Sequence, residues 1–223
     1  MTTALLFLSA IMAVVVWWLV RPTLNVSPWI ARSTIQTARG NGEFAMPPVQ
    51  VGLWVFLAVA TSLFALLISA YHMRMMEADW TAMSLPRVLW LNTVVLVLAS
   101  VAMQWTRGSA RRGQAGGVKN GLLAAGGFSF AFLAGQLWAW QQLNASGAFT
   151  LANPAYAFFL LLTALHGIHL LGGLWVWARA TVRVFRGAEV EKVRLSVELC
   201  TVYWHFLLLV WTVLFAVLLN THQ

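Results

Sequence analysis

Charged residues are scarce in this sequence: Asp, Glu, Lys and Arg together make up only 9% of its 223 residues. A water-soluble domain carries about 25% charged residues, which cover its surface. With 61% hydrophobic residues, this chain lacks the polar side chains needed to face water on all sides. The composition therefore excludes a soluble globular protein and indicates a protein whose main solvent is lipid.

Cysteine is almost absent, and so are the short motifs of common enzyme classes. The one cysteine, Cys200, lies in an apolar run, where it forms neither a disulfide framework nor a metal cage and serves as a small apolar filler. The sequence contains no G-x-S-x-G, Walker, H-E-x-x-H or dinucleotide-binding motif. We therefore expect no catalytic centre in this chain.

Six apolar runs are present, and each has about the length of a membrane span. About 20 residues of helix cross a hydrocarbon core of ~30 Å, and backbone groups in lipid must be satisfied within the segment. The predicted fold is therefore all-α, a polytopic membrane helical bundle of six transmembrane helices. The runs cover residues 4–20, 50–71, 88–106, 121–140, 155–178 and 198–219.

The chain is predicted to divide at its one long connection, which contains four of the six prolines. Residues 1–20 form a peripheral N-terminal transmembrane helix, which we expect to be uncleaved because no lysine or arginine precedes its apolar run. Residues 21–49 form a cytoplasmic linker. Residues 50–223 form a five-helix bundle, in which glycines and alanines of the fourth and fifth spans permit close helix packing.

Basic residues gather in alternate loops. Loops 21–49, 107–120 and 179–197 hold twelve of the fourteen lysines and arginines, whereas loop 72–87 is charge-balanced and loop 141–154 is uncharged. The positive-inside rule predicts that the three basic loops face the cytoplasm and that both termini lie outside. The net charge of +8 thus reflects membrane topology, and we expect no nucleic-acid partner.

Four ionisable residues lie within the last two apolar runs, where such groups are costly. His166 and His169 share one face of the fifth span, and His205 and Glu198 lie in the sixth. One hypothesis is a metal or haem site built from the three histidines, because imidazole ligates iron and copper. We favour interhelical hydrogen bonding, because no Cys, Asp or Glu stands at ligand spacing beside them.

Glu198 also has two interpretations. Arg194, four residues earlier, is the expected partner of its carboxylate, and the nearby helix start would favour an anion through the helix dipole. The alternative is a carboxylate of a proton relay.

The polar residues of the last two spans carry a family resemblance. Residues 166–173 resemble H-G-x-H-x-x-x-G, residues 198–211 resemble E-x5-W-H-F-x3-V-W, and residues 52–57 resemble G-[FL]-W-x-F-L. A Leu-Pro pair before the third span, followed by Asn-Thr, completes the set. In this order, over about residues 47–219, the motifs are similar to the cytochrome c oxidase subunit III family. The matching residues are Gly52, Trp54, Asn92, His166, Gly167, His169, Gly172, Glu198, Trp204, His205, Phe206 and Trp211.

The resemblance implies an accessory subunit of a bacterial respiratory haem-copper terminal oxidase in the inner membrane. In that family, subunit III binds no haem or copper, packs against the catalytic subunit I and helps to preserve it, and holds lipid. We therefore expect haem and copper in the partner subunit, subunit II as a further partner, and phospholipid bound to this chain. Basic side chains of the cytoplasmic loops are candidate contacts for lipid headgroups: Arg107, Arg111, Arg112, Arg179 and Arg183.

The chain departs from the family at two carboxylates. Ala60 stands where members often have a glutamate, and Leu208 where an aspartate often follows the W-H-F motif. A proton-antenna role that depends on these carboxylates is therefore not supported here. Accessory subunits of quinol oxidases or nitric oxide reductases are alternative interpretations, as is a free-standing membrane redox or transport protein. Unbroken spans, with every proline at or outside a span end, argue against a carrier.

Overall fold

The computed structural model describes residues 48–80, 85–145 and 154–220, and in this part of the chain every regular element is an α-helix. All five helices are long and apolar enough to cross a membrane, so the chain is a multi-pass membrane protein. The predicted sixth helix at residues 4–20 and nearly all of the linker at 21–49 lie outside the described residues. The helices are α2 (Pro48–Arg74), α3 (Val88–Arg111), α4 (Ala115–Ala145), α5 (Pro154–Phe185) and α6 (Val190–Asn220).

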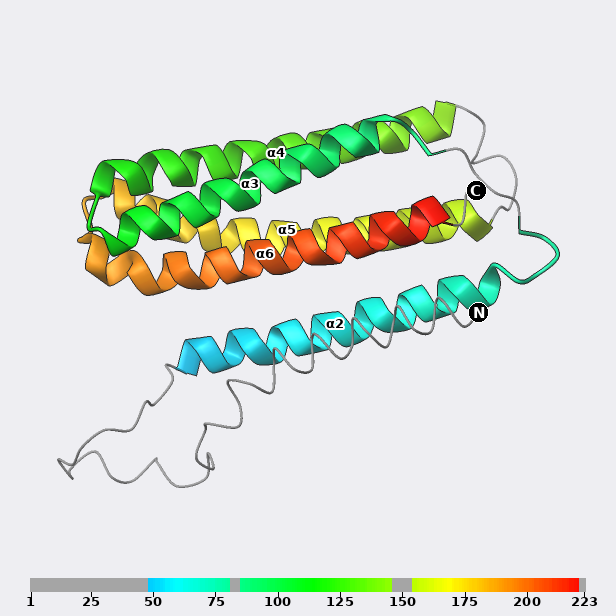
Figure 1. Ribbon diagram of the computed structural model, residues 1–223, viewed down its shortest axis with the longest axis horizontal. Helices are drawn as coiled ribbons and strands as arrows, with labels where there is room; N and C mark the ends of the chain where they lie inside the picture. Colours follow the sequence, from blue (N-terminus) through cyan, green and yellow to red (C-terminus); the bar gives the residue numbers. More distant parts are fainter. Residues whose placement is uncertain (1–47, 81–84, 146–153, 221–223) are drawn as a thin grey trace, which may run out of the picture. The chain divides into compact units, whose positions relative to one another are not determined.

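The chain forms two compact units, Met1–Ala65 and Leu66–Gln223. In the second unit, α3 packs on α4 and α6, and α5 packs on the same two helices. The four helices therefore close into a ring around a common core (Figure 1). This core is filled by large side chains that are fully buried: Phe132 and Phe159 from α4 and α5, and Trp204 and Trp211 from α6.

Two predicted cytoplasmic loops are mostly helical in the structure, which corrects the sequence-based boundaries. α3 continues through the predicted loop 107–120 as far as Arg111, and α5 continues through the predicted loop 179–197 as far as Phe185. A helix leaving the membrane keeps its own backbone hydrogen bonds, and arginine is a good helix former, so nothing ends the helix at the hydrocarbon edge. Arg107, Arg111, Arg179 and Arg183 therefore lie on helices.

The remaining connections are tight turns that need glycine. Gly113 has φ 69° between α3 and α4, and Gly187 has φ 83° between α5 and α6. Side chains with a Cβ rarely adopt this left-handed conformation. Both turns lie at the same end of the four-helix ring, opposite the C-terminus (Figure 1).

Glycines of α4 permit the close packing that the sequence predicts. A Cβ at Gly121 would lie 2.2 Å from Thr106 Oγ1 and 3.2 Å from Thr106 Cα on α3, and a Cβ at Gly126 would lie 2.2 Å from Trp177 Cζ2 on α5. Helix association in lipid relies on this kind of backbone approach, because the surrounding tails give no hydrophobic drive. The small residues of α4 thus set the distances to both neighbours.

Replacing Gly121 tests this packing. We expect Gly121→Ala to destabilise the protein by about 1–3 kcal/mol, because the added methyl meets Thr106 and its backbone. Gly127→Ala is the matched control, since a Cβ there meets nothing within 4 Å. Thermal unfolding of the detergent-solubilised chain should show a lower Tm for the first variant only. Equal Tm values would contradict the packing role of Gly121.

Candidate functional site

His166 lies at the centre of the bundle and is fully buried. Its ring lies between Phe132 on α4, with centroids 5.7 Å apart, and Trp211 on α6, with centroids 5.3 Å apart. Neither ring nitrogen has a hydrogen-bond partner in the described part of the chain. The aromatic contacts show that this imidazole joins three helices through packing. The interhelical hydrogen bond that the sequence predicts for His166 is not found among the described residues.

His169 contributes to the joint between α5 and α6 through its backbone. Its Nδ1 lies 2.8 Å from the carbonyl of Leu165, and its own carbonyl accepts a 2.7 Å hydrogen bond from the hydroxyl of Tyr203. A Cβ at Gly173, one turn further along α5, would lie 2.5 Å from Tyr203. The Tyr203 side chain therefore fits between two turns of α5.

His205 joins α6 to α3 on the outer side of the bundle. Its Nδ1 is hydrogen-bonded to the Ser100 hydroxyl, and its Nε2 lies 3.2 Å from Gln104 Oε1. Leu208, at the place of the family's aspartate, lines a groove between α3 and α6 together with His205, whereas Ala60 lies on α2. The imidazole is thus held by two neutral side chains.

Glu198 joins the same two helices at the end nearest the basic turns. Arg111 Nε on α3 lies 3.0 Å from Glu198 Oε1, and the predicted partner Arg194 lies at 3.6 Å. The interhelical partner from α3, which the sequence did not reveal, is therefore the closer one. α6 begins at Val190, so Glu198 lies beyond the first turn and the predicted stabilisation by the helix dipole is wrong.

Indole N–H groups form a second set of links between helices. Trp204 donates to Ser129 Oγ on α4 at 2.9 Å, and Trp211 donates to Thr93 Oγ1 on α3 at 3.0 Å. Trp177 on α5 donates to the Leu122 carbonyl on α4 at 3.0 Å. A buried indole needs such an acceptor in lipid, so each bond ties one helix to another at a fixed position.

The hydroxyls that bond these indole and imidazole groups were missed from the sequence. Ser129, Thr93 and Ser100 are single small polar residues in apolar runs, and each could equally bond the carbonyl of its own helix. Ser129 and Thr93 do so as well, with Ala125 and Leu89. Only the positions of the neighbouring helices show which hydroxyl also bonds a side chain of another helix.

The remaining motif residues are Asn92, Phe206, Trp54 and three glycines. Asn92 is buried and donates to Gln136 Oε1 on α4 at 3.3 Å, and Phe206 is buried. Gly52 and Gly172 have no atom within 4 Å of an added Cβ, and Gly167 has one at 3.9 Å, so close packing does not explain these three glycines. Trp54 lies on α2.

Among the described residues, no three His, Cys, Asp or Glu side chains are grouped closely enough to hold a metal ion. His166 faces aromatic rings, whereas His205 is bonded to α3. Cys200 is buried as a free thiol. The arrangement provides interhelical contacts and does not bring the histidines to a common point.

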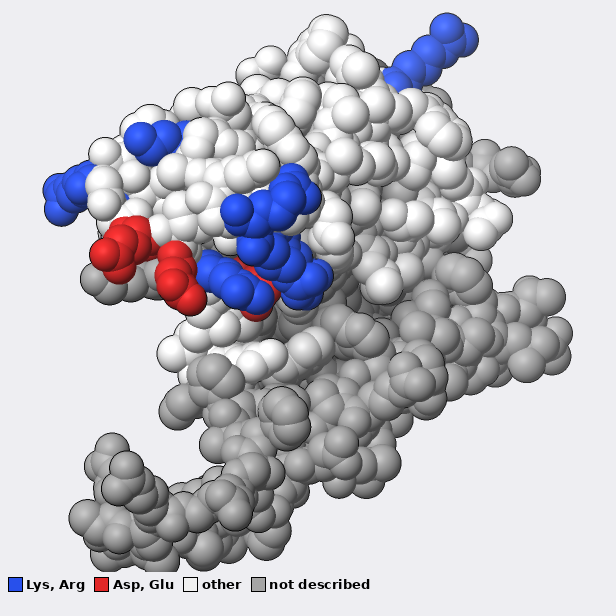
Figure 2. All heavy atoms as spheres, turned by 60° about the vertical axis from the view of Figure 1, so that its left-hand side comes forward, with Lys and Arg blue, Asp and Glu red and all other residues white. Residues whose placement is uncertain are grey.

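Arginines gather at the end of the bundle that carries the α3–α4 and α5–α6 turns. Figure 2 shows lysine and arginine side chains over this end, with acidic side chains beside them. Arg111, Arg112, Arg179 and Arg183 are exposed here. Arg112 donates to Gln114 Oε1 at 3.3 Å, and Arg107 Nε is buried without a partner among the described residues. Arg111 is paired with Glu198, whereas Arg112, Arg179 and Arg183 have no acidic partner among the described residues and can meet anions.

One acidic group outside the spans has a shifted pKa. The Arg74 guanidinium, hydrogen-bonded to Asp79 through both of its terminal nitrogens, holds the pKa of the Asp79 carboxyl below its usual range. Any stability that this exposed pair contributes is present above the pKa that Asp79 has in the unfolded chain. It is lost as pH falls through the lowered pKa of Asp79 in the folded chain. Such surface pairs contribute little.

The comparisons with known proteins point to one family. The sequence model described as cytochrome c oxidase subunit III matches residues 2–221. A cytochrome c oxidase subunit 3 of Synechocystis is 26% identical over 190 residues, covering 82% of this chain and 80% of the relative. A probable cytochrome c oxidase subunit 3 of Mycobacterium leprae is 30% identical over 180 residues, covering 76% and 86%.

The chain belongs to the cytochrome c oxidase subunit III family. It is therefore an accessory, membrane-embedded subunit of a respiratory haem-copper oxidase complex. This agrees with the family expected from the motifs of the last two spans.

The Trp204–Ser129 bond can be tested with a matched pair of serine variants. We expect Ser129→Ala to lower the free energy of unfolding by about 1–3 kcal/mol, because a buried indole N–H loses its acceptor. Ser62→Ala is the control, because the exposed Ser62 hydroxyl bonds only the Ala58 carbonyl of its own helix; its change should stay within about 0.5 kcal/mol. Equal changes in Tm for the two variants in detergent would show that the Trp204–Ser129 bond contributes nothing to stability.

Proposed function

We propose that this chain is the non-catalytic subunit III of a bacterial respiratory terminal oxidase, where it stabilises the catalytic subunit I and binds phospholipid. The observation that supports this most directly is the use of the intramembrane polar groups. His205, Trp204 and Trp211 bond other helices of the same chain. Polar groups that are used in this way suit a rigid scaffold. In this proposal, haem and copper belong to the catalytic partner subunit, and subunit II is a further partner.

The proposed location is the bacterial inner membrane, with the arginine-rich end in the cytoplasm. The α3–α4 and α5–α6 turns share one end of the bundle (Figure 1), as the positive-inside rule requires of two basic connections. The C-terminus then lies on the outer side. An even number of spans, including the predicted helix at residues 4–20, would place the N-terminus there as well.

Phospholipid binding is proposed at the arginine-rich end. Exposed arginines near the membrane surface attract anionic headgroups by about 1 kcal/mol each. Arg179 and Arg183 are one turn apart on α5 and both exposed, so together they could hold one phosphate. Apolar side chains of α5, such as Trp175 and Val176, are exposed nearby and suited to contact acyl chains.

Purification of the tagged chain in a mild detergent tests the assembly. We expect it to bring down a haem-containing catalytic subunit, with the absorbance spectrum of a haem-copper oxidase. The haem type and the copurifying proteins would also separate a cytochrome c oxidase from a quinol oxidase. Recovery of the folded chain alone, under conditions that keep a known oxidase intact, would contradict the proposed function.

Arginine substitution tests the lipid site. We expect Arg183→Gln to weaken retention of phosphatidylglycerol on the purified complex by about fivefold, the effect of removing one interfacial charge. Arg87→Gln is the control, since Arg87 is exposed at the opposite end, where α3 begins. Native mass spectrometry would count bound lipid, and unchanged occupancy in Arg183→Gln would contradict this site.

A further inference from the structure

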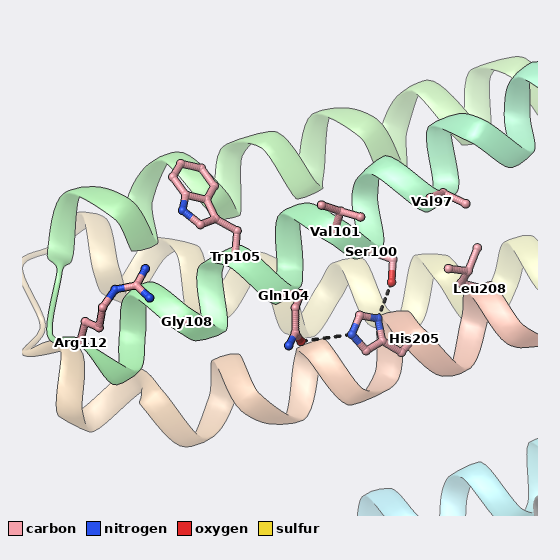
Figure 3. Close-up of a pocket in the computed structure, with 9 residues that line it drawn as sticks. All are labelled: Val97, Ser100, Val101, Gln104, Trp105, Gly108, Arg112, His205 and Leu208. Carbon is pink, nitrogen blue, oxygen red and sulfur yellow. Dashed lines mark hydrogen bonds between the residues drawn. The ribbon is translucent and has the colours of Figure 1, made fainter.

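The groove between α3 and α6 is cationic at one end and apolar at the other. One face of α3 lines it from Val97 to Arg112, a length of about 22 Å along the helix. Figure 3 shows Arg112 at one end, the Gln104–His205 pair in the middle and Leu208 beyond this pair. The groove has a volume of about 420 Å³, and its lining contains no acidic residue. Its polarity therefore falls in one direction along the bundle.

Arg112 forms the cationic end of the groove. It is the C-cap residue of α3, and a Cβ at Gly108, one turn earlier, would lie 3.4 Å from Arg112 Nη1 and 3.8 Å from Nη2. The guanidinium therefore lies back over Gly108, at the mouth of the groove. Its Nε donates to Gln114, whereas Nη1 and Nη2 have no acceptor among the described residues. Two N–H groups of a guanidinium match two oxygens of a phosphate.

Gln104 supplies a second donor in the middle of the groove. Its Oε1 lies 3.2 Å from His205 Nε2, so the ring N–H donates to the amide oxygen and the Ser100 hydroxyl donates to Nδ1. The amide NH2 of Gln104 is left as a donor without an acceptor in the described part of the chain. Gln104 is four residues from Gly108, about 6 Å along the helix. A hydrogen-bond acceptor that follows a phosphate can therefore bind here.

A diacyl phospholipid carries its groups in the same order. Its phosphate is followed within a few bonds by ester carbonyls, which only accept hydrogen bonds, and then by apolar chains. The groove offers a cation, then an amide donor, then the apolar walls of Val97, Val101 and Leu208. Charge, hydrogen-bonding groups and apolar surface thus complement an anionic lipid together. The apolar face of another helix would leave the guanidinium and the amide without acceptors.

We propose that this groove binds one anionic diacyl phospholipid. The phosphate binds the Arg112 guanidinium, an ester carbonyl accepts from the Gln104 amide, and one acyl chain lies against Val101. The site is separate from Arg179 and Arg183, because these lie on α5, which does not line the groove. The inference rests on the lipid-binding part of the proposed function, to which it adds a second place.

Photolabelling of the purified complex tests the site. The probe is phosphatidylglycerol with a diazirine at the end of one acyl chain, and mass spectrometry identifies the labelled peptides. We expect label on the α3 segment around Val97 and Val101. A diacylglycerol with the same chains should give about fivefold less label, because it lacks the phosphate that binds one interfacial charge. Equal labelling by the diacylglycerol would overturn the inference.

Inorganic phosphate separates a lipid site from a simple anion site. At a concentration equal to that of the lipid probe, inorganic phosphate should not reduce the labelling, because it makes no contact with the apolar walls. Displacement of the probe under these conditions would show that the groove holds an anion only, and the proposal would be wrong.

Substitutions of the two donors give a second readout. Arg112→Gln should reduce the label on the α3 segment by about fivefold, and Gln104→Leu should reduce it by about threefold, the effect of one average interhelical hydrogen bond. Arg186→Gln is the matched control, because Arg186 is exposed in the α5–α6 turn at the same end of the bundle and does not line the groove. Equal labelling in Arg112→Gln and Arg186→Gln would contradict a specific phosphate contact.

A crosslinker in the groove reports any other occupant. Benzoylphenylalanine at Val101, which is 59% exposed, should react with phospholipid in the complete complex. A crosslink to another oxidase subunit, or to residues 1–47 of this chain, would show that protein covers the groove and would overturn the inference.

Copurification in the same sample separates this inference from the proposed function. If oxidase subunits copurify and the α3 segment is not labelled, the groove assignment is wrong and the proposed assembly stands. If no oxidase subunit copurifies, the proposed assembly fails, whereas the labelling is still measured on the chain alone and decides the lipid site.

Discussion

Hydrocarbon supplies no hydrogen-bond partner, and this constraint governs the arrangement of the bundle. Many of the indoles and hydroxyls within the spans find their partners on other helices. Trp204 and Trp211 tie α6 to α4 and α3, and Tyr203 ties it to α5. The last helix is therefore bonded to every other helix of the ring. This explains why the motif residues concentrate there, although none of them forms a reactive centre.

Close packing makes these bonds possible. The indole of Trp177 reaches the Leu122 carbonyl because Gly126 leaves space for its ring. Tyr203 lies against Gly173 in the same way. A small residue on one helix and a long aromatic donor on the next thus act as a unit. A rigid module of this kind can present a fixed face and a fixed set of arginines to partners and lipid.

Helix number and position in the described part of the chain were predictable, because the length of an apolar run can be read directly from the sequence. Helix ends were not, since the arginines after the apolar part of α3 continue the helix into water. The roles of His166 and His205 as polar groups within spans followed from their depth alone. The partners of such polar groups could not be predicted. Arg111 bonds Glu198, and Ser100 bonds His205, and each partner lies about a hundred residues away in sequence. Such pairings depend on the three-dimensional packing of the helices.

The central claim is that the intramembrane histidines hold helices together and handle no electrons. The most direct measurement is the iron and copper content per oxidase complex, with the haem absorbance, for the single variants His166→Ala, His169→Ala and His205→Ala. The account predicts the same metal content and spectrum as the unmodified complex in every complex recovered, even where recovery falls. Loss of one haem or one copper from an otherwise intact complex would contradict it.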